Sequence, residues 1–292
     1  MSGRAGHRWR EAVAGGLFLL PGVTIIWGFV LLAGVLAFVL SFTHCSQFGT
    51  IRWAGLYNYR KLLTDPLALR SFLNTLQYVC VFVPANLALA LGIAMLLNRQ
   101  FPGMRLIRSV YFVPVVISGV VTVSIFRFIY DRDFGPINAV LASLGFEPVP
   151  WLWDAGYAMW SIIAMDLWKA SAFFSIIFLA ALQDVPRELH EAAMVDGAGS
   201  WLRFRHVTIP SLRPVITAVL ALSSIGAFRV FIPMFVLTEG GPAYSTRTIA
   251  LHAYLSGFRD AQLGYSSATS FALLGVILAA TLVLTWVRRD EA

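Results

Sequence analysis

Two charged residues inside a long apolar stretch are the first candidates for chemistry. Asp166 and Lys169 are three residues apart, so a helix would place them on one face. Charged groups buried in apolar helices usually face a cavity or a partner, and both can form charge-assisted hydrogen bonds with hydroxyl groups. The alternative is an internal ion pair in which the two residues neutralise each other and stabilise packing. The sequence leaves both interpretations open.

No motif for catalysis accompanies this pair. A phosphate-binding P-loop requires a lysine directly after a glycine, and neither of the two lysines, Lys61 and Lys169, has that neighbour. The H-E-x-x-H and G-x-S-x-G patterns are also absent from the sequence. Cys45 and Cys80 are the only cysteines, which excludes a disulfide scaffold. We therefore expect no catalytic residue, metal site or cofactor in this chain.

The composition indicates an integral membrane protein. Of 292 residues, 58% are hydrophobic and only 13% are charged. Soluble domains average about 45–50% apolar and about 25% charged residues. The aromatic content of 14% excludes a disordered chain.

The apolar residues are concentrated in continuous runs. A helix needs about 20 of them to cross a membrane, whereas a β-barrel would show short alternating strands. Six runs qualify: 13–41, 72–97, 109–130, 157–183, 214–237 and 268–287. The first is too long for the core of a signal peptide, so we expect it to be retained. The predicted fold class is an all-α integral membrane protein with six transmembrane helices, and the membrane domain covers 13–287.

The positive residues predict the orientation. With the N-terminus inside, twelve Lys and Arg residues lie on the cytoplasmic side and seven lie outside. This bias predicts cytoplasmic termini, 1–12 and 288–292. Most of the net charge of +7 therefore reflects topology, and we expect no nucleic acid partner.

One long cytoplasmic loop, 184–213, is predicted to contain two short helices. Asp184 is a plausible N-cap for the first helix, 186–195. Asp196 and Gly197 should end it, because glycine adopts a positive φ at little cost. The second helix is expected over 201–207. Its predicted cap is Ser200, and its predicted end is set by Pro210 and Pro214.

The first predicted helix has a face of small residues and acids. Its alanines permit close approach by another surface, and Glu188 and Glu191 are unfavourable at an anionic cytoplasmic leaflet. A protein partner is therefore favoured over the alternative of an interfacial helix resting on lipid headgroups. Asp196 either contacts that partner or caps the helix locally.

The same loop carries a longer pattern. In order it reads Glu191-Ala192-Ala193, Asp196-Gly197-Ala198, Phe204, Ile209-Pro210 and Pro214. This pattern resembles the EAA loop in the membrane subunits of binding-protein-dependent ABC carbohydrate importers, the maltose-permease-like type I family. Further matches occur at Asn74-Thr75, Asp133–Asn138 and Leu237–Pro242, and the resemblance covers roughly 15–287.

The resemblance implies a multi-subunit transporter in a bacterial or archaeal cytoplasmic membrane. The expected partners are a second homologous permease, a homodimer or heterodimer of ATPase subunits, an extracytoplasmic solute-binding protein and membrane lipid. ATP and Mg would be bound by the ATPase subunits and not by this chain. The residues that the resemblance assigns to ATPase coupling are Glu188, Glu191, Ala192, Ala193, Asp196 and Gly197.

The resemblance also implies a substrate path on the helices that flank the loop. The expected lining residues are Asp166, Lys169, Ala170, Phe173, Ser223, Gly226, Ala227, Arg229 and Val230. Aromatic faces beside polar groups suit a sugar ring, and a phosphorylated polyol stays open because Lys169 and Arg229 can meet an anion. Two other functions also stay open. One is a secondary transporter with Asp166 as its ion site, and the other is a docking or assembly subunit without transport activity.

Overall fold

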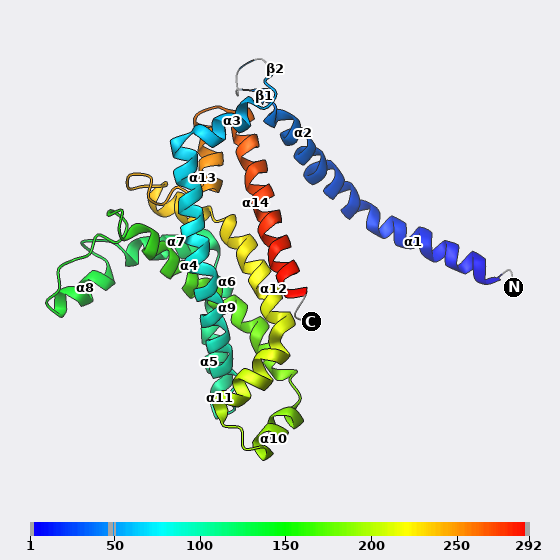
Figure 1. Ribbon diagram of the computed structural model, residues 1–292, viewed down its shortest axis with the longest axis vertical. Coiled ribbons are helices and arrows are strands. Elements are labelled where there is room, and N and C mark those ends of the chain that lie inside the picture. Colours follow the sequence, from blue (N-terminus) through cyan, green and yellow to red (C-terminus); the bar gives the residue numbers. More distant parts are fainter. Residues whose placement is uncertain (1–2, 46–48, 50, 290–292) are drawn as a thin grey trace. The chain divides into compact units, whose positions relative to one another are not determined.

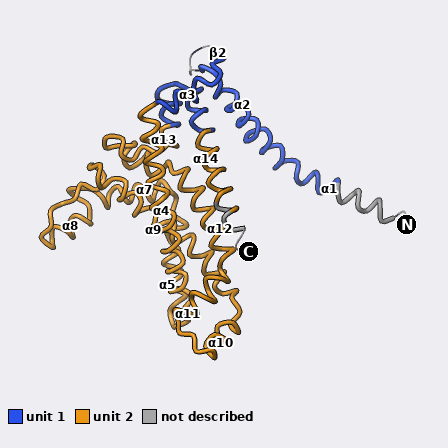
Figure 2. Tube along the Cα trace, in the orientation of Figure 1, with its two compact units in different colours: residues 1–64, 253–271 blue, residues 65–252, 272–292 orange. Residues whose placement is uncertain are grey.

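The computed structural model describes residues 3–45, 49 and 51–289. The chain forms two compact units (Figure 2). Unit 1 comprises Met1–Thr64 and Ala253–Phe271, and unit 2 comprises Asp65–His252 and Ala272–Ala292. The C-terminal helix α14 (Leu263–Arg289) begins in the first unit and ends in the second.

Unit 1 begins with a long apolar helix. Its elements in chain order are α1 (Gly3–Ile25), η1 (Ile26–Leu31), α2 (Leu32–Ser41), the antiparallel pair β1 (Thr43–His44) and β2 (Arg52–Trp53), α3 (Tyr57–Thr64) and η4 (Leu255–Arg259). The stretch Val13–Ser41 is one candidate span of 29 residues, and none of its most apolar window is buried. Its side chains are therefore available to lipid or to another subunit.

Polar side chains of α3 hold unit 1 together. The buried Asn58 Nδ2 donates hydrogen bonds of 2.9 Å to the carbonyl oxygens of Ser41 and Thr43. Lys61 Nζ donates to Gln262 Oε1 at 2.7 Å. These bonds fix α3 both to the end of α2 and to the segment that leads into α14.

Unit 2 is built on three long helices that pack along one another (Figure 1). They are α4 (Pro66–Leu97), α9 (Ala158–Gln183) and α12 (Ile209–Phe228). Ala90 and Ala94 lie four residues apart on α4 and are fully buried, as is Phe178 of α9. Small residues at this spacing allow close approach of the helices, which compensates for the weak hydrophobic drive between helices in lipid.

The third expected span, 109–130, is broken in the structure. It consists of α5 (Met104–Tyr111), α6 (Val113–Val116) and α7 (Gly119–Ile129). The chain bends by 100° between Met104–Val116 and Gly119–Ile129. At the break Ile117 is extended, with φ −70° and ψ 130°. Over the described residues, five helices are long and apolar enough to span a membrane, and six spans result if this bent pair is one span.

Asn138 organises the segment after α7. It lies on α8 (Pro136–Ser143), and its Nδ2 donates to the carbonyl oxygens of Arg132 and Val149, each at 3.0 Å. Its Oδ1 accepts from Val149 N and Trp151 Nε1, also at 3.0 Å. A Cβ at Gly135 would collide with the backbone oxygen of Asp131, so glycine is required there. Within the stretch Asp133–Asn138, these observations give a structural reason for Gly135 and Asn138.

The fifth expected span, 214–237, ends earlier than predicted. The helix α12 stops at Phe228, with Arg229 as its C-cap, and a short π-helix, η3 (Met234–Thr238), follows. Pro233 cannot donate a helical hydrogen bond and so does not continue α12. The apolar composition continues past Arg229, but the helix does not.

The loop that leads to α13 (Ile249–Tyr254) is fixed to α4. Asn74 Nδ2 donates to the carbonyl oxygens of Tyr244 and Arg247, at 2.7 and 3.0 Å. Thr75 Oγ1 accepts from Ile249 N at 2.9 Å. The Asn74-Thr75 pair therefore has a local structural role in the described fold.

Candidate functional site

A cavity of about 580 Å³ lies within unit 2 and contains all nine residues expected for the substrate path. Those residues are Asp166, Lys169, Ala170, Phe173, Ser223, Gly226, Ala227, Arg229 and Val230. Other lining residues that the sequence reasoning missed include Tyr78, Phe82, Val115, Phe231 and Ile232. The cavity has mostly apolar walls and a few polar groups, a composition typical of small-molecule sites.

Helical spacing explains why two separate segments meet in this cavity. On α9, Asp166, Lys169, Ala170 and Phe173 follow the i, i+3, i+4, i+7 pattern. Ser223, Gly226, Ala227 and Val230 repeat it at the end of α12 and in the residues that follow. This spacing places each set on one face, and packing of α9 against α12 turns the two faces toward the same space.

Asp166 and Lys169 bind different partners. Tyr78 OH donates a hydrogen bond of 2.7 Å to Asp166 Oδ2. Lys169 Nζ donates to the carbonyl oxygen of Ile117 at 2.6 Å and to Thr122 Oγ1 at 3.2 Å. In the part of the chain that the structure describes, no salt bridge joins Asp166 to Lys169. The internal ion pair considered from the sequence is therefore absent from this conformation.

Tyr78 and Phe82 contribute an aromatic wall from α4. They are four residues apart, and their rings stack with centroids 5.1 Å apart and an interplanar angle of 13°. The i, i+4 aromatic spacing is visible in the sequence. The pairing of Tyr78 with Asp166, 88 residues away, is not.

Of the two cationic side chains that line the cavity among the described residues, Lys169 has hydrogen-bond partners and Arg229 has none in the described contacts. Arg229 lies at the C-cap of α12 and is exposed, and the described contacts include no hydrogen bond or ion pair of its side chain. Ser223 is different, because it is buried and accepts a hydrogen bond of 3.1 Å from Asn86 Nδ2. Its hydroxyl therefore contributes to helix packing as well as to the cavity lining.

The loop 184–213, which carries the predicted ATPase-coupling residues and is called the coupling loop below, begins differently from the prediction. Its first helix is α10 (Arg187–Val195), and its N-cap is Pro186. Asp184 is instead the C-cap of α9. The predicted break at Gly197 is present, since Gly197 has a φ of +78°. A left-handed turn of this kind favours glycine.

The second half of the loop merges with α12. The helix α11 (Ser200–Arg203) has Gly199 and not Ser200 as its N-cap, and it continues through η2 (Phe204–Thr208) into α12. The whole stretch Ser200–Phe228 forms one candidate span. Pro210 lies where the π-helix η2 passes into α12, and the helix continues past both Pro210 and Pro214. The expectation that these prolines end the second helix is therefore wrong.

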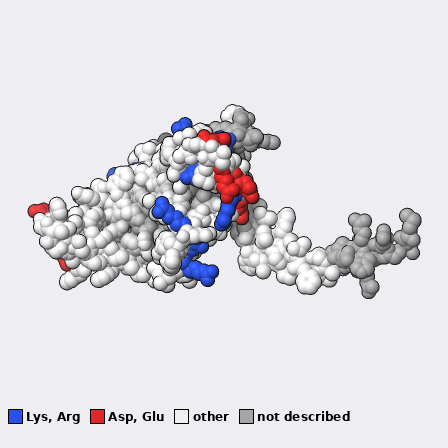
Figure 3. All heavy atoms as spheres, turned by 90° about the horizontal axis from the view of Figure 1, so that it is seen from below, with Lys and Arg blue, Asp and Glu red and all other residues white. Residues whose placement is uncertain are grey.

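The surface of the coupling loop combines acids with exposed apolar residues. Glu188, Glu191 and Asp196 are exposed, and Val195 beside them is 88% exposed. Figure 3 views the protein from below, and in this view acidic atoms gather in one patch with basic atoms beside them. No hydrogen bond of the Asp196 carboxylate occurs in the described part of the loop, so local capping is not observed. Ala192, Ala193 and Gly197 are not fully buried either, which leaves the small-residue face accessible.

Residues 53–290 match the family described as binding-protein-dependent transport system inner membrane component. The match covers most of the chain, including the cavity and the coupling loop.

The chain belongs to this family of permeases.

Two relatives of the permease match nearly end to end. The trehalose/maltose transport system permease protein of Thermococcus litoralis is 32% identical over 283 residues, covering 97% of this chain and 96% of the relative. The lactose transport system permease protein of Rhizobium radiobacter is 32% identical over 287 residues, covering 96% and 95%. The permease also resembles a chain in a crystal structure of a bacterial alginate ABC transporter, with a TM-score of 0.86 over 97% of this chain and 96% of the other. That chain is 20% identical, and the likeness concerns the fold.

Proposed function

We propose that this permease is one transmembrane subunit of an ATP-driven importer and forms half of the path for a carbohydrate. The observation that carries the proposal is the cavity in unit 2, where two helices of the predicted path meet an aromatic wall from α4. The apolar faces suit a sugar ring, and the polar groups suit its hydroxyls. Relatives that match nearly the full chain are named as permeases for disaccharides, which agrees with this substrate class.

The proposed assembly contains a second homologous permease, two ATPase subunits and an extracytoplasmic binding protein. ATP and Mg bind to the ATPase subunits, and this chain binds no cofactor. Both termini lie in the cytoplasm, with the bent α5–α7 segment as one of six spans. The membrane is a bacterial or archaeal cytoplasmic membrane.

The proposed mechanism is alternating access driven through the coupling loop. Closure of the ATPase dimer pushes on α10, whose acids and small residues are exposed for docking. Because the helix is continuous from Ser200 to Phe228, movement at the loop is carried directly to the cavity residues at its far end. The path opens outward to receive the substrate, and hydrolysis resets it inward.

The test is transport by the assembled complex in proteoliposomes, with its binding protein and a labelled disaccharide. The proposal expects uptake that requires ATP inside the vesicle and ATPase activity that the loaded binding protein stimulates. Uptake by this chain alone, abolished by an uncoupler, would instead identify a secondary transporter. Complex formation with no substrate-dependent ATPase stimulation would identify a docking subunit.

Arg229 favours a second substrate class, an acidic or phosphorylated carbohydrate. Its guanidinium lines the cavity without a recorded partner among the described residues, whereas Lys169 already binds backbone at Ile117. Arg229→Gln should reduce uptake of an anionic sugar at least tenfold and leave uptake of a neutral disaccharide within twofold. Equal loss for both substrates would reject a charge-reading role.

A further inference from the structure

A second cavity of unit 2, of about 990 Å³, is strongly basic. Fourteen residues line it, and its charged members are Arg99, Arg105, Arg108 and Arg187, with His190 beside them. None of these described lining residues is acidic. It shares no lining residue with the proposed sugar cavity, so the proposed path leaves it unexplained.

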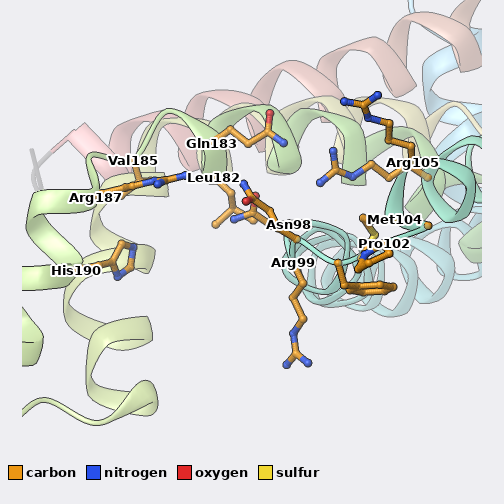
Figure 4. A pocket seen from close by; sticks show the side chains of 14 residues that line it. Asn98, Arg99, Pro102, Met104, Arg105, Leu182, Gln183, Val185, Arg187 and His190 are labelled. Atoms are coloured by element: carbon orange, nitrogen blue, oxygen red, sulfur yellow. The ribbon is translucent and has the colours of Figure 1, made fainter.

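The basic residues reach this cavity from two sides (Figure 4). Arg99 follows α4, and Arg105 is the second residue of α5. Arg187 and His190 come from α10 of the coupling loop. The sharp turn between α4 and α5 depends on Gly103, whose φ of +90° favours glycine.

Arg108 has a structural role at this turn. Its Nε and Nη2 donate to the carbonyl oxygen of Leu97 at 3.0 and 2.6 Å, which ties α5 to the last residue of α4. The guanidinium groups of Arg99, Arg105 and Arg187 have no hydrogen bond or ion pair among the described residues. All three side chains line one cavity in which no described lining residue is acidic, and an anion bound there would relieve the repulsion between their charges.

The neighbouring surface of α5 indicates which anion. Leu106 and Val110 are four residues apart, on one side of the helix, and are 70% and 63% exposed. Phe101, just before α5, is also exposed. Exposed apolar side chains on the same short helix as Arg105 fit an acyl chain near a phosphate group, whereas a soluble anion would not contact them.

We propose that this basic pocket binds the phosphate group of an anionic phospholipid from the cytoplasmic leaflet. The headgroup lies among Arg99, Arg105 and Arg187, and the acyl chains lie against Leu106 and Val110. The proposal rests on the orientation given in the proposed function, which places the end of α4 and the coupling loop at the cytoplasmic face. A lipid held between α5 and α10 joins the membrane surface to the helix that is proposed to dock on the ATPase.

The test measures lipids retained by the assembled transporter in nanodiscs of phosphatidylcholine mixed with phosphatidylglycerol. After detergent extraction and washing, native mass spectrometry counts the bound lipids of each class. The wild type should retain phosphatidylglycerol at least fivefold over phosphatidylcholine. Arg105→Gln and Arg187→Gln should each reduce this preference at least threefold.

Arg205→Gln is the matched control. Arg205 is an exposed arginine of the same loop, lies on η2 and does not line the cavity. The substitution removes one positive charge from the same loop, and the lipid preference should stay within 1.5-fold of the wild type. Equal losses in all three variants would overturn the pocket assignment, because they would reflect net charge alone.

A competition arm distinguishes a lipid from free phosphate. Inorganic phosphate at 10 mM should leave the retained phosphatidylglycerol unchanged if the lipid is the ligand. Displacement by phosphate, with the same sensitivity to Arg105→Gln and Arg187→Gln, would support a phosphate site but overturn its assignment to lipid. Loss of ATPase subunits from the two variants without any change in bound lipid would identify an acidic protein partner and also overturn the proposal.

Substrate-stimulated ATPase activity, measured in the same mixed-lipid nanodiscs, separates this proposal from the proposed function. Substrate-stimulated ATPase activity without anionic lipid preference would reject the lipid site and leave the importer function supported. A lipid preference without any substrate-stimulated ATPase activity would support the lipid site and reject the importer function.

Discussion

Lys169 Nζ lies 2.6 Å from the carbonyl oxygen of Ile117, at the point where the α5–α7 segment bends by 100°. A broken helix in a membrane exposes backbone groups that water cannot reach, and a nearby donor must satisfy them. The long side chain of Lys169 supplies that donor from α9 and also reaches Thr122 Oγ1 on α7. One residue predicted for the substrate path therefore stabilises the broken span that borders the same cavity.

Replacing Lys169 should lower the stability of the folded permease, because Lys169 holds the broken span in place. Lys169→Met removes a hydrogen bond from a charged donor and leaves the Ile117 carbonyl unsatisfied, which should cost about 2–3 kcal/mol. The measurement is the thermal unfolding midpoint of the purified complex. Lys169→Arg keeps a cationic donor and should recover most of the loss. An unchanged midpoint for Lys169→Met would show that the bond does not hold the break.

The hydrogen bond between Tyr78 and Asp166 should contribute more to the free energy of unfolding than a tyrosine hydrogen bond to a neutral side chain. Tyr78→Phe removes a 2.7 Å hydrogen bond to a carboxyl group, with an expected loss of about 1.5–3 kcal/mol. Tyr111→Phe is the matched control, because it removes a bond of 3.1 Å between Tyr111 and the neutral Ser171. That loss should be about 1 kcal/mol.

A double-mutant cycle assigns the Tyr78 effect to Asp166. Combining Tyr78→Phe with Asp166→Asn should be clearly less destabilising than the sum of the two single changes, since both remove the same bond. Strict additivity in the thermal unfolding of the complex would contradict a direct interaction.

Filling the cavity should block transport without unfolding the protein. A Cβ at Gly226 meets no heavy atom within 4 Å, so Gly226→Leu extends into the cavity that this residue lines. Substrate uptake should fall at least tenfold, while the unfolding midpoint changes little. The control is Gly92→Leu, because Gly92 is also free of close contacts and lies outside the cavity lining. Equal effects of both substitutions on uptake would remove the cavity from the proposed path.

In the coupling loop, an alanine substitution at Gly197 should impair ATPase coupling, whereas the same substitution at Gly199 should be tolerated. Gly197 has a φ of +78°, so Gly197→Ala places a side chain in the left-handed region at a cost of about 1–2 kcal/mol. We expect a several-fold loss of substrate-stimulated ATPase activity in the assembled complex. Gly199→Ala is the control, because Gly199 has an ordinary φ of −66° and no close neighbour. Retained coupling in Gly197→Ala would argue that the geometry of this turn does not transmit the signal.

Several features of the site follow from local sequence patterns. The apolar runs identify the helices, since a membrane-spanning helix satisfies its backbone within the segment and needs only length and apolar side chains. The spacing of Asp166, Lys169, Ala170 and Phe173 places them on one face whatever the helix packs against. The break at Gly197 follows equally from a local backbone preference.

Other features depend on contacts between distant segments. An apolar run has the same composition whether the helix continues or bends, so it does not predict the break at Ile117. The break is stabilised by a hydrogen bond from Lys169 of α9, a residue distant in the sequence. The end of α12 at Phe228 likewise falls within a run that stays apolar.

By itself the sequence determined where the apolar helices lie and which side chains share a face, because both properties arise from local patterns; it did not show the break at Ile117 or the early end of α12. The tertiary structure alone decided that Asp166 binds Tyr78, that Lys169 binds the broken span, and that Arg99, Arg105 and Arg187 line the same pocket. These pairings join residues far apart in the chain, and only helix packing brings such residues within hydrogen-bonding or electrostatic range.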